Sequence, residues 1–165
     1  MLAVVKAKAE PGVTIKQIPI PKPDPGELLI KVKSASICGT DIAIYDWTPW
    51  AESHILPPVV IGHEVLGEVL EINGPADKIK VGDLISSETH IFCGECYQCK
   101  IGENNVCTNE AILGISIDGI FAEYVKIPAK NLWKVDSQKV RPEIAAIYDP
   151  FGNAVHAVQL SWRRA

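Results

Sequence analysis

Hydrophobic and polar residues alternate along much of the chain, and this alternation predicts short β-strands. The clearest case is Glu27–Ser36, in which Leu28, Ile30 and Val32 alternate with a leucine and two lysines. A period of two is typical of a strand with one buried face. Further strand candidates are residues 13–20, 64–72, 84–86 and 120–127. Many short strands separated by turns predict a mainly β fold, arranged as a barrel or a sandwich.

Glycine and proline mark the places where these elements bend or end. Gly67 lies inside the 64–72 candidate, where we expect a bulge or a bend. Towards the end of the chain, Pro142 is followed by an acidic residue and an apolar run, which predicts the start of a helix. Pro150 and Gly152 are expected to interrupt that helix.

Composition and charge exclude several classes of protein. The 165 residues are 47% hydrophobic and 22% charged, which is typical of a globular domain with a buried core. The 16 basic and 20 acidic side chains give a net charge of -4 without a basic stripe, so we expect no nucleic-acid partner. Lys6 interrupts the apolar start of the chain, and the apolar stretch 55–61 is far too short to span a membrane. We therefore predict a cytoplasmic protein without a membrane partner.

Nucleotide-binding signatures are missing from the sequence. None of the 12 glycines has another glycine two positions later, so there is no GxG turn, and there is no P-loop. The chain therefore lacks the usual sequence that holds the pyrophosphate of a dinucleotide.

Four of the five cysteines lie within 15 residues, where Cys93, Cys96, Cys99 and Cys107 form a C-x2-C-x2-C-x7-C pattern. Thiolates at such spacings can surround one tetrahedral ion, and Zn²⁺ bound by four sulfurs has no open position. Ferredoxin-type clusters continue their first three cysteines with x3-C-P, which differs from this spacing. Two disulfides are the other alternative, although they are rare in a reducing cytosol. We therefore predict a structural zinc site.

Three residues from distant segments form a second candidate site. Cys38 follows the clearest strand, His63 lies 25 residues later after Gly62, and Asp149 lies near the end of the chain. One thiolate, one imidazole and one carboxylate make a three-ligand zinc site with an open fourth position, as in catalytic sites. Glu64 is adjacent to His63, so in extended backbone their side chains point to opposite sides. We predict His63 as the ligand and Glu64 as a supporting or exchangeable one.

Several motifs recur together in one known family. They are Cys-Gly-Thr-Asp at 38–41, Gly-His-Glu at 62–64, Val-Gly-Asp at 81–83 and the cysteine segment at 93–107. In order and approximate spacing the chain resembles the zinc-containing medium-chain alcohol dehydrogenases. Within that family, the segments 44–51, 88–90 and 149–156 are most similar to the threonine dehydrogenases. The resemblance implies a GroES-like β-barrel catalytic domain, in agreement with the strand pattern.

The resemblance also implies a reaction and residue roles. Zinc on the three predicted ligands would lower the pKa of a substrate hydroxyl, and hydride would leave the carbinol carbon for NAD⁺. Thr40 would relay the hydroxyl proton, Glu64 would tune metal coordination, and His90 would help to position an amino-acid substrate. The implied partners are a small-molecule alcohol or amino-acid substrate and, for full-length members, the other subunits of a homotetramer.

Two departures from the family pattern stand out. Ala43 occupies the position where members commonly carry the histidine that ends the proton relay, and alanine cannot accept a proton. The match also stops near Val158, before a nucleotide-binding domain would begin. The resemblance thus implies a catalytic domain at 1–150, with a structural zinc lobe at 88–110. Residues 151–165 would be the truncated start of a connection to a missing Rossmann domain.

Three hypotheses follow. In the leading one, the chain is part of an NAD-dependent enzyme with two zinc ions per chain. The full-length form would oxidise threonine to 2-amino-3-oxobutanoate, and this chain alone would be inactive because the cofactor-holding half is absent. The second is a polyol or secondary-alcohol dehydrogenase with the same metal site. The third is a non-catalytic zinc-binding module, which Ala43 favours. The retained ligands of the second site argue against the module, because a purely structural protein needs only the four cysteines.

Overall fold

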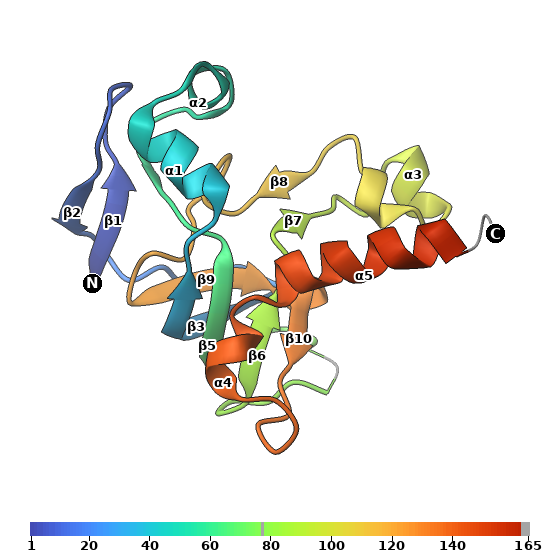
Figure 1. Cartoon of the computed structure of the whole chain (residues 1–165). Coiled ribbons are helices and arrows are strands. Elements are labelled where there is room, and N and C mark those ends of the chain that lie inside the picture. Colours follow the sequence, from blue (N-terminus) through green and yellow to red (C-terminus); the bar gives the residue numbers. More distant parts are fainter. Residues whose placement is uncertain (77, 163–165) are drawn as a thin grey trace.

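The strands of the molecule are short, apart from two that pair along ten residues each. The computed structural model describes residues 1–76 and 78–162. Its strands are β1 (Leu2–Lys6), β2 (Thr14–Gln17), β3 (Glu27–Ser36), β4 (Val59–Val60), β5 (Glu64–Asn73), β6 (Leu84–Ser87), β7 (His90–Ile91), β8 (Ala111–Ile112), β9 (Tyr124–Pro128) and β10 (Leu132–Lys134). The larger sheet has the order β10-β6-β5-β3-β9, the second β2-β1-β4, and β7 pairs with β8 (Figure 1). The predicted mainly β fold is confirmed.

Helices are fewer and mostly short. They are α1 (Gly39–Asp46), α2 (Pro49–His54), α3 (Tyr97–Lys100), α4 (Pro142–Ala145) and α5 (Tyr148–Trp162), with 3₁₀ turns η1 (Asn104–Val106) and η2 (Ala129–Asn131). The expected interruption at Pro150 and Gly152 is wrong, because α5 runs through both residues. Pro150 is the third residue of α5, where a backbone N–H would have no partner within the helix, so proline is tolerated there.

The central ladder of the larger sheet is formed by β3 and β5. Their antiparallel pairing runs from Glu27 opposite Asn73 to Ser36 opposite Glu64. Leu28 and Ile30 are fully buried in the main core, as the alternating pattern predicts. The register shifts beside Gly67, which confirms the expected bulge.

The two larger sheets are joined at β1, which closes the barrel. Ala3 bridges to Ala122, and the Val4 amide donates to the carbonyl oxygen of Phe121, just before β9. The strand that sequence predicts at 120–127 therefore begins later, at Tyr124, because residues 119–121 bond to the segment around Gly62 instead. All paired strands in the described part of the chain run antiparallel.

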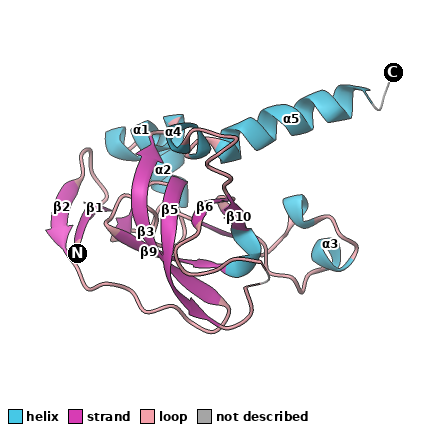
Figure 2. Cartoon of the chain, turned by 90° about the horizontal axis from the view of Figure 1, so that it is seen from below, coloured by secondary structure: helices cyan, strands magenta, loops and turns pink. Residues whose placement is uncertain are grey.

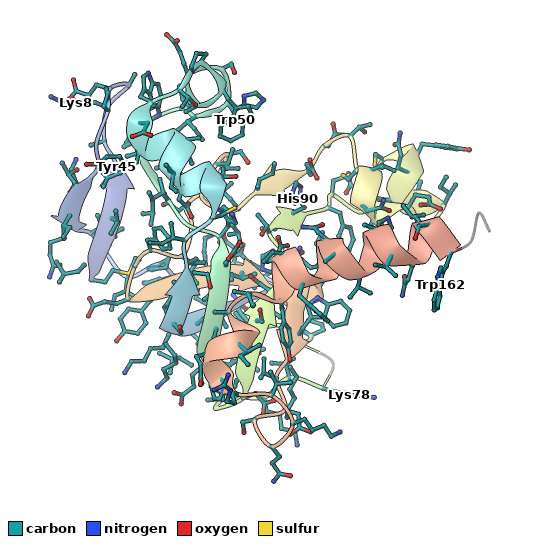
Figure 3. The ribbon with its side chains drawn as sticks, in the orientation of Figure 1. Lys8, Tyr45, Trp50, Lys78, His90 and Trp162 are labelled. Atoms are coloured by element: carbon teal, nitrogen blue, oxygen red, sulfur yellow. The ribbon has the colours of Figure 1, made fainter. Side chains whose placement is uncertain are left out.

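Two parts extend from this barrel. One is the lobe formed by residues 88–110, which carries α3 and η1, and the other is α5 (Figure 2). No residue of α5 is buried, and its last described residue, Trp162, lies at the far end of the helix (Figure 3). Residues 163–165, which end the predicted connecting segment 151–165, lie outside the described residues. The helices of the described part are too short or too polar to cross a membrane.

Candidate metal centres

The four clustered cysteines meet in the lobe. The sulfur atoms of Cys93, Cys96, Cys99 and Cys107 all lie within 4.8 Å of one another. The Cys107 sulfur lies 3.5 Å from that of Cys93 and 3.9 Å from that of Cys96, and all of these cysteines are free. Four sulfurs placed ~2.3 Å from one zinc ion would be about 3.8 Å apart. The lobe therefore has the donor type and the spacing that tetrahedral zinc requires.

Backbone amides and burial act differently on these thiols. The amides of Cys99 and Thr108 lower the pKa of the Cys96 thiol to about 5. The amides of Glu95 and Cys96 lower the pKa of Cys93, whereas burial raises the pKa of Cys99 to about 12. Several thiolates so close together repel one another, so all four can be ionised only around a cation.

The second donor group lies where β3 ends and β5 begins. Cys38 follows β3 and is the N-cap of α1, His63 lies between β4 and β5, and Glu64 is the first residue of β5. Because β3 and β5 are antiparallel and their ladder ends at the pair Ser36 and Glu64, the end of one strand lies beside the start of the other.

Cys38, His63 and Glu64 form this group, with ligand atoms that all lie within 4.8 Å of one another. His63 and Glu64 are only 5% and 6% exposed. Gly62 has a φ of +90°, so the backbone turns just before His63. The ligand atoms of these two adjacent residues lie close together, which a fully extended backbone would prevent. Burial raises the pKa of Glu64, and the charge of Asp149 adds to that rise.

The role of Asp149 as the third zinc ligand stays a prediction. Among the described residues, Asp149 is not part of the group that includes Cys38 and His63. Its Oδ1 accepts a hydrogen bond of 3.1 Å from the amide of Thr89. Asp149 lies close enough to influence the carboxyl of Glu64 by its charge, and Glu64 is the carboxylate that is grouped with Cys38 and His63.

Asp41 is a residue that the sequence reasoning quoted in a motif without giving it a role. Its Oδ2 accepts a hydrogen bond of 2.9 Å from the amide of Cys38, and its Oδ1 faces His63 Nδ1 at 3.8 Å. Both facing atoms are buried and have no hydrogen-bond partner. Burial raises the pKa of Asp41, while the Cys38 amide and the His63 charge oppose the rise. Its third position in α1 was the available signal, since an acid there accepts from the N-cap amide.

The remaining predicted residues lie around the group. The Thr40 hydroxyl is 3.7 Å from the Cys38 sulfur. Ala43 lies three residues further along α1. His90, on β7 (Figure 3), has its Nδ1 2.8 Å from Glu110 Oε2. It lines a cavity of about 1100 Å³ together with Asp149 and other residues of α5, and Cys38, His63 and Glu64 are not among the lining residues.

Comparisons with known proteins agree with these features. Residues 24–137 match the family described as Alcohol dehydrogenase GroES-like domain. Over 158 residues the chain is 49% identical to the L-threonine 3-dehydrogenase of Pyrococcus furiosus and 51% identical to that of Caldanaerobacter subterraneus. Each alignment covers 96% of this chain and 45% of the relative, so the chain spans about half the length of the curated relatives it matches.

Solved structures show the same fold. A short chain alcohol dehydrogenase of Escherichia coli, in complex with NADH, superposes with a TM-score of 0.79 at 38% identity, over 92% of this chain and 42% of that one. Galactitol-1-phosphate dehydrogenase of Escherichia coli has a TM-score of 0.87 at 24% identity, over 98% of this chain and 45% of that one, and shares the fold. The family match extends over more than half of the residues. With its antiparallel barrel and its four-cysteine lobe, the chain belongs to the alcohol dehydrogenase GroES-like domain family.

Proposed function

We propose that this chain is the metal-binding catalytic part of a zinc-dependent oxidoreductase that oxidises the hydroxyl of L-threonine, with NAD⁺ as the hydride acceptor. The observation that carries the proposal is the nearly buried group of Cys38, His63 and Glu64, present in addition to the four-cysteine lobe. The relatives named L-threonine 3-dehydrogenase, at 49% and 51% identity, support the choice of substrate.

The donor set suits a catalytic zinc site. Cys38, His63 and Glu64 offer three ligands of the types that zinc binds, which leaves a fourth position for substrate. Zinc bound there supplies Lewis acidity that lowers the pKa of an alcohol. Asp41 faces Nδ1 of His63, so it favours the tautomer that carries its proton on Nδ1 and leaves Nε2 for the metal. Asp149 lies near this group, and we assign its side chain to the cationic part of the substrate.

Proton removal is assigned to Thr40, whose hydroxyl lies 3.7 Å from the Cys38 sulfur. A threonine hydroxyl passes a proton on but does not retain it, so a further acceptor is required. Ala43 offers none, and we therefore expect water or another base to receive the proton. His90 is assigned to substrate positioning, since it lines the same cavity as Asp149.

The proposal is tested with a chimera in which residues 1–158 replace the matching part of the Pyrococcus furiosus relative. NADH formation is then measured by absorbance with L-threonine, butane-2,3-diol and sorbitol. We expect the highest kcat/KM for L-threonine, and we expect Cys38→Ala to abolish turnover while the lobe keeps its zinc.

Other outcomes would contradict the proposal. Oxidation of the diol or of sorbitol but not of L-threonine would identify a polyol or secondary-alcohol dehydrogenase. A well-folded chimera that binds two zinc ions per chain but oxidises none of these alcohols would identify a non-catalytic zinc-binding module, the reading that Ala43 favours.

A further inference from the structure

His63 lies on backbone that the strand ladder of the larger sheet does not hold. It falls between β4, which ends at Val60, and β5, which begins at Glu64. A different segment bonds to this stretch. The amides of Gly119, Phe121 and Ile120 donate to the carbonyl oxygens of Val60, Ile61 and Gly62, over 2.7, 2.9 and 3.0 Å. The backbone that presents His63 is therefore held by residues 119–121.

The two segments approach so closely that neither has room for a side chain. A Cβ atom on Gly114 would lie 2.5 Å from the carbonyl oxygen of Gly62 and 2.7 Å from its nitrogen. A Cβ atom on Gly119 would lie closer still to the same oxygen, and one on Gly62 would enter the ring of Phe121. We call Gly62, Gly114 and Gly119 the glycine crossing. Atoms added at Gly114 or Gly119 would meet backbone, which cannot rotate away as a flexible side chain can.

We propose that Gly114 and Gly119 are positioning residues for His63, and that the glycine crossing fixes the imidazole within the donor group. The inference rests on the proposed function, because it concerns the metal that His63 binds. The four-cysteine lobe supplies an internal reference, since its ligands lie at 93–107, outside the crossing. A change at the glycine crossing should weaken metal binding at the His63 site and leave zinc binding by the lobe unchanged.

The test measures Co²⁺ binding by the purified chain with zinc already in the lobe. Binding at the second site is followed by the visible absorption of Co²⁺, and zinc is counted separately. We expect Gly119→Ala to weaken Co²⁺ binding about 10- to 100-fold, the range found when residues supporting a metal ligand are changed. Zinc in the lobe should remain at one ion per chain.

Gly114→Ala and Gly82→Ala form a matched pair. Both glycines have positive φ angles, +73° and +88°, so alanine strains the backbone at either position. A Cβ atom on Gly82 would have nothing within 4 Å, whereas one on Gly114 would press on Gly62. We expect Gly114→Ala to weaken Co²⁺ binding and Gly82→Ala to leave it unchanged. Equal effects of the two variants would overturn the inference, because backbone strain alone would then account for the loss.

A milder variant keeps the test usable if alanine at 119 prevents folding. The ring of Phe121 lies against Gly62, so Phe121→Leu loosens the contact without adding atoms. Weaker Co²⁺ binding by Phe121→Leu, with zinc still in the lobe, would support the inference. If the parent chain binds Co²⁺ at the second site and a folded Gly119→Ala or Phe121→Leu chain binds it with equal affinity, the inference is overturned. The proposed function would not be affected by that result. A parent chain that binds metal only in the lobe would overturn the proposed function and the inference with it.

Discussion

At the scale of single residues, Glu64 lies together with Cys38 and His63, whereas Asp149 lies outside this group and accepts a hydrogen bond from the Thr89 amide. The sequence contains two carboxylates that could act as the third zinc ligand, Glu64 and Asp149. Which of them binds the metal depends on their distances from the thiol and the imidazole, and composition and spacing do not specify these distances.

The choice between the two carboxylates can be measured. We expect Glu64→Gln to weaken zinc binding at the second site about 10- to 100-fold, because an amide donates less charge than a carboxylate to the ion. Asp149→Asn should have a smaller effect. Zinc affinities come from competition with a colorimetric chelator, after correction for the lobe. A larger loss in Asp149→Asn would restore Asp149 as the ligand.

Asp41 gives a second prediction at this scale. Its Oδ1 faces His63 Nδ1, and its Oδ2 accepts from the Cys38 amide, so it orients two ligands from one carboxylate. We expect Asp41→Asn to weaken zinc binding by roughly tenfold or more without unfolding the chain. Asp46→Asn, at the exposed end of α1, serves as the control. Equal zinc affinities for the two variants, measured by the same chelator competition, would rule out this role for Asp41.

At the scale of elements, a buried lysine joins the start of the chain to α1. Lys6 is fully buried, and its Nζ donates to the carbonyl oxygens of Glu10, Gly12 and Tyr45 at 2.6, 2.9 and 3.3 Å. The ammonium also lies 4.8 Å from the ring centroid of Trp47. Burial lowers the pKa of Lys6. Three backbone acceptors compensate for the loss of water, so this lysine secures the end of the helix that carries the proposed proton relay.

Replacing this lysine tests the junction. We expect Lys6→Met to reduce the free energy of unfolding by about 1–3 kcal/mol, because it leaves the partly buried carbonyl groups of Glu10 and Gly12 without the lysine donor. Lys8→Met is the matched control, since Lys8 is exposed and pairs with Glu10 over 3.6 Å at the surface. Its effect should stay within about 0.5 kcal/mol. Urea unfolding followed by circular dichroism gives both values, and identical midpoints would contradict the assigned role of Lys6.

The elements differ in how well they could be predicted from the sequence. β3 was predictable with its bounds because its alternation is local, and the lobe was predictable because its ligands are close in sequence. The course of helix α5 could not be predicted. Proline breaks a helix in its interior but is tolerated in its first turn, and the sequence does not show where α5 begins. No sequence pattern indicated the glycine crossing. Gly114 and Gly119 pack against Gly62, which lies more than 50 residues away in the sequence.

At the scale of the whole molecule, barrel and lobe are stabilised by different forces. The main core contains residues such as Leu28, Ile30 and Val69, and none of its buried members lies between 93 and 107. In that segment only Cys107 is buried among the described residues. We therefore expect the lobe to depend on a bound metal ion, whereas the barrel is stabilised by apolar burial.

Removal of zinc should therefore destabilise the lobe and leave the barrel folded. We expect chelation of zinc to accelerate amide hydrogen exchange in residues 93–107, while the amides of β3 and β5 remain protected. Mass spectrometry of the exchanged chain, with and without chelator, provides the measurement. Loss of protection in β3 and β5 at the same chelator concentration would show that the barrel depends on the lobe.

The register of β3 and β5 also bears on how related chains can diverge. Glu64 forms the last pair of the antiparallel ladder with Ser36, Cys38 follows two residues later, and α1, α2 and β4 lie in the segment between Cys38 and Glu64. Trp50 and Leu56 lie on the surface of this segment, where they are 39% and 86% exposed, and neither belongs to the ladder. Residues in such surface loops can change, and the segment can lengthen or shorten, without disturbing the pairing of β3 with β5.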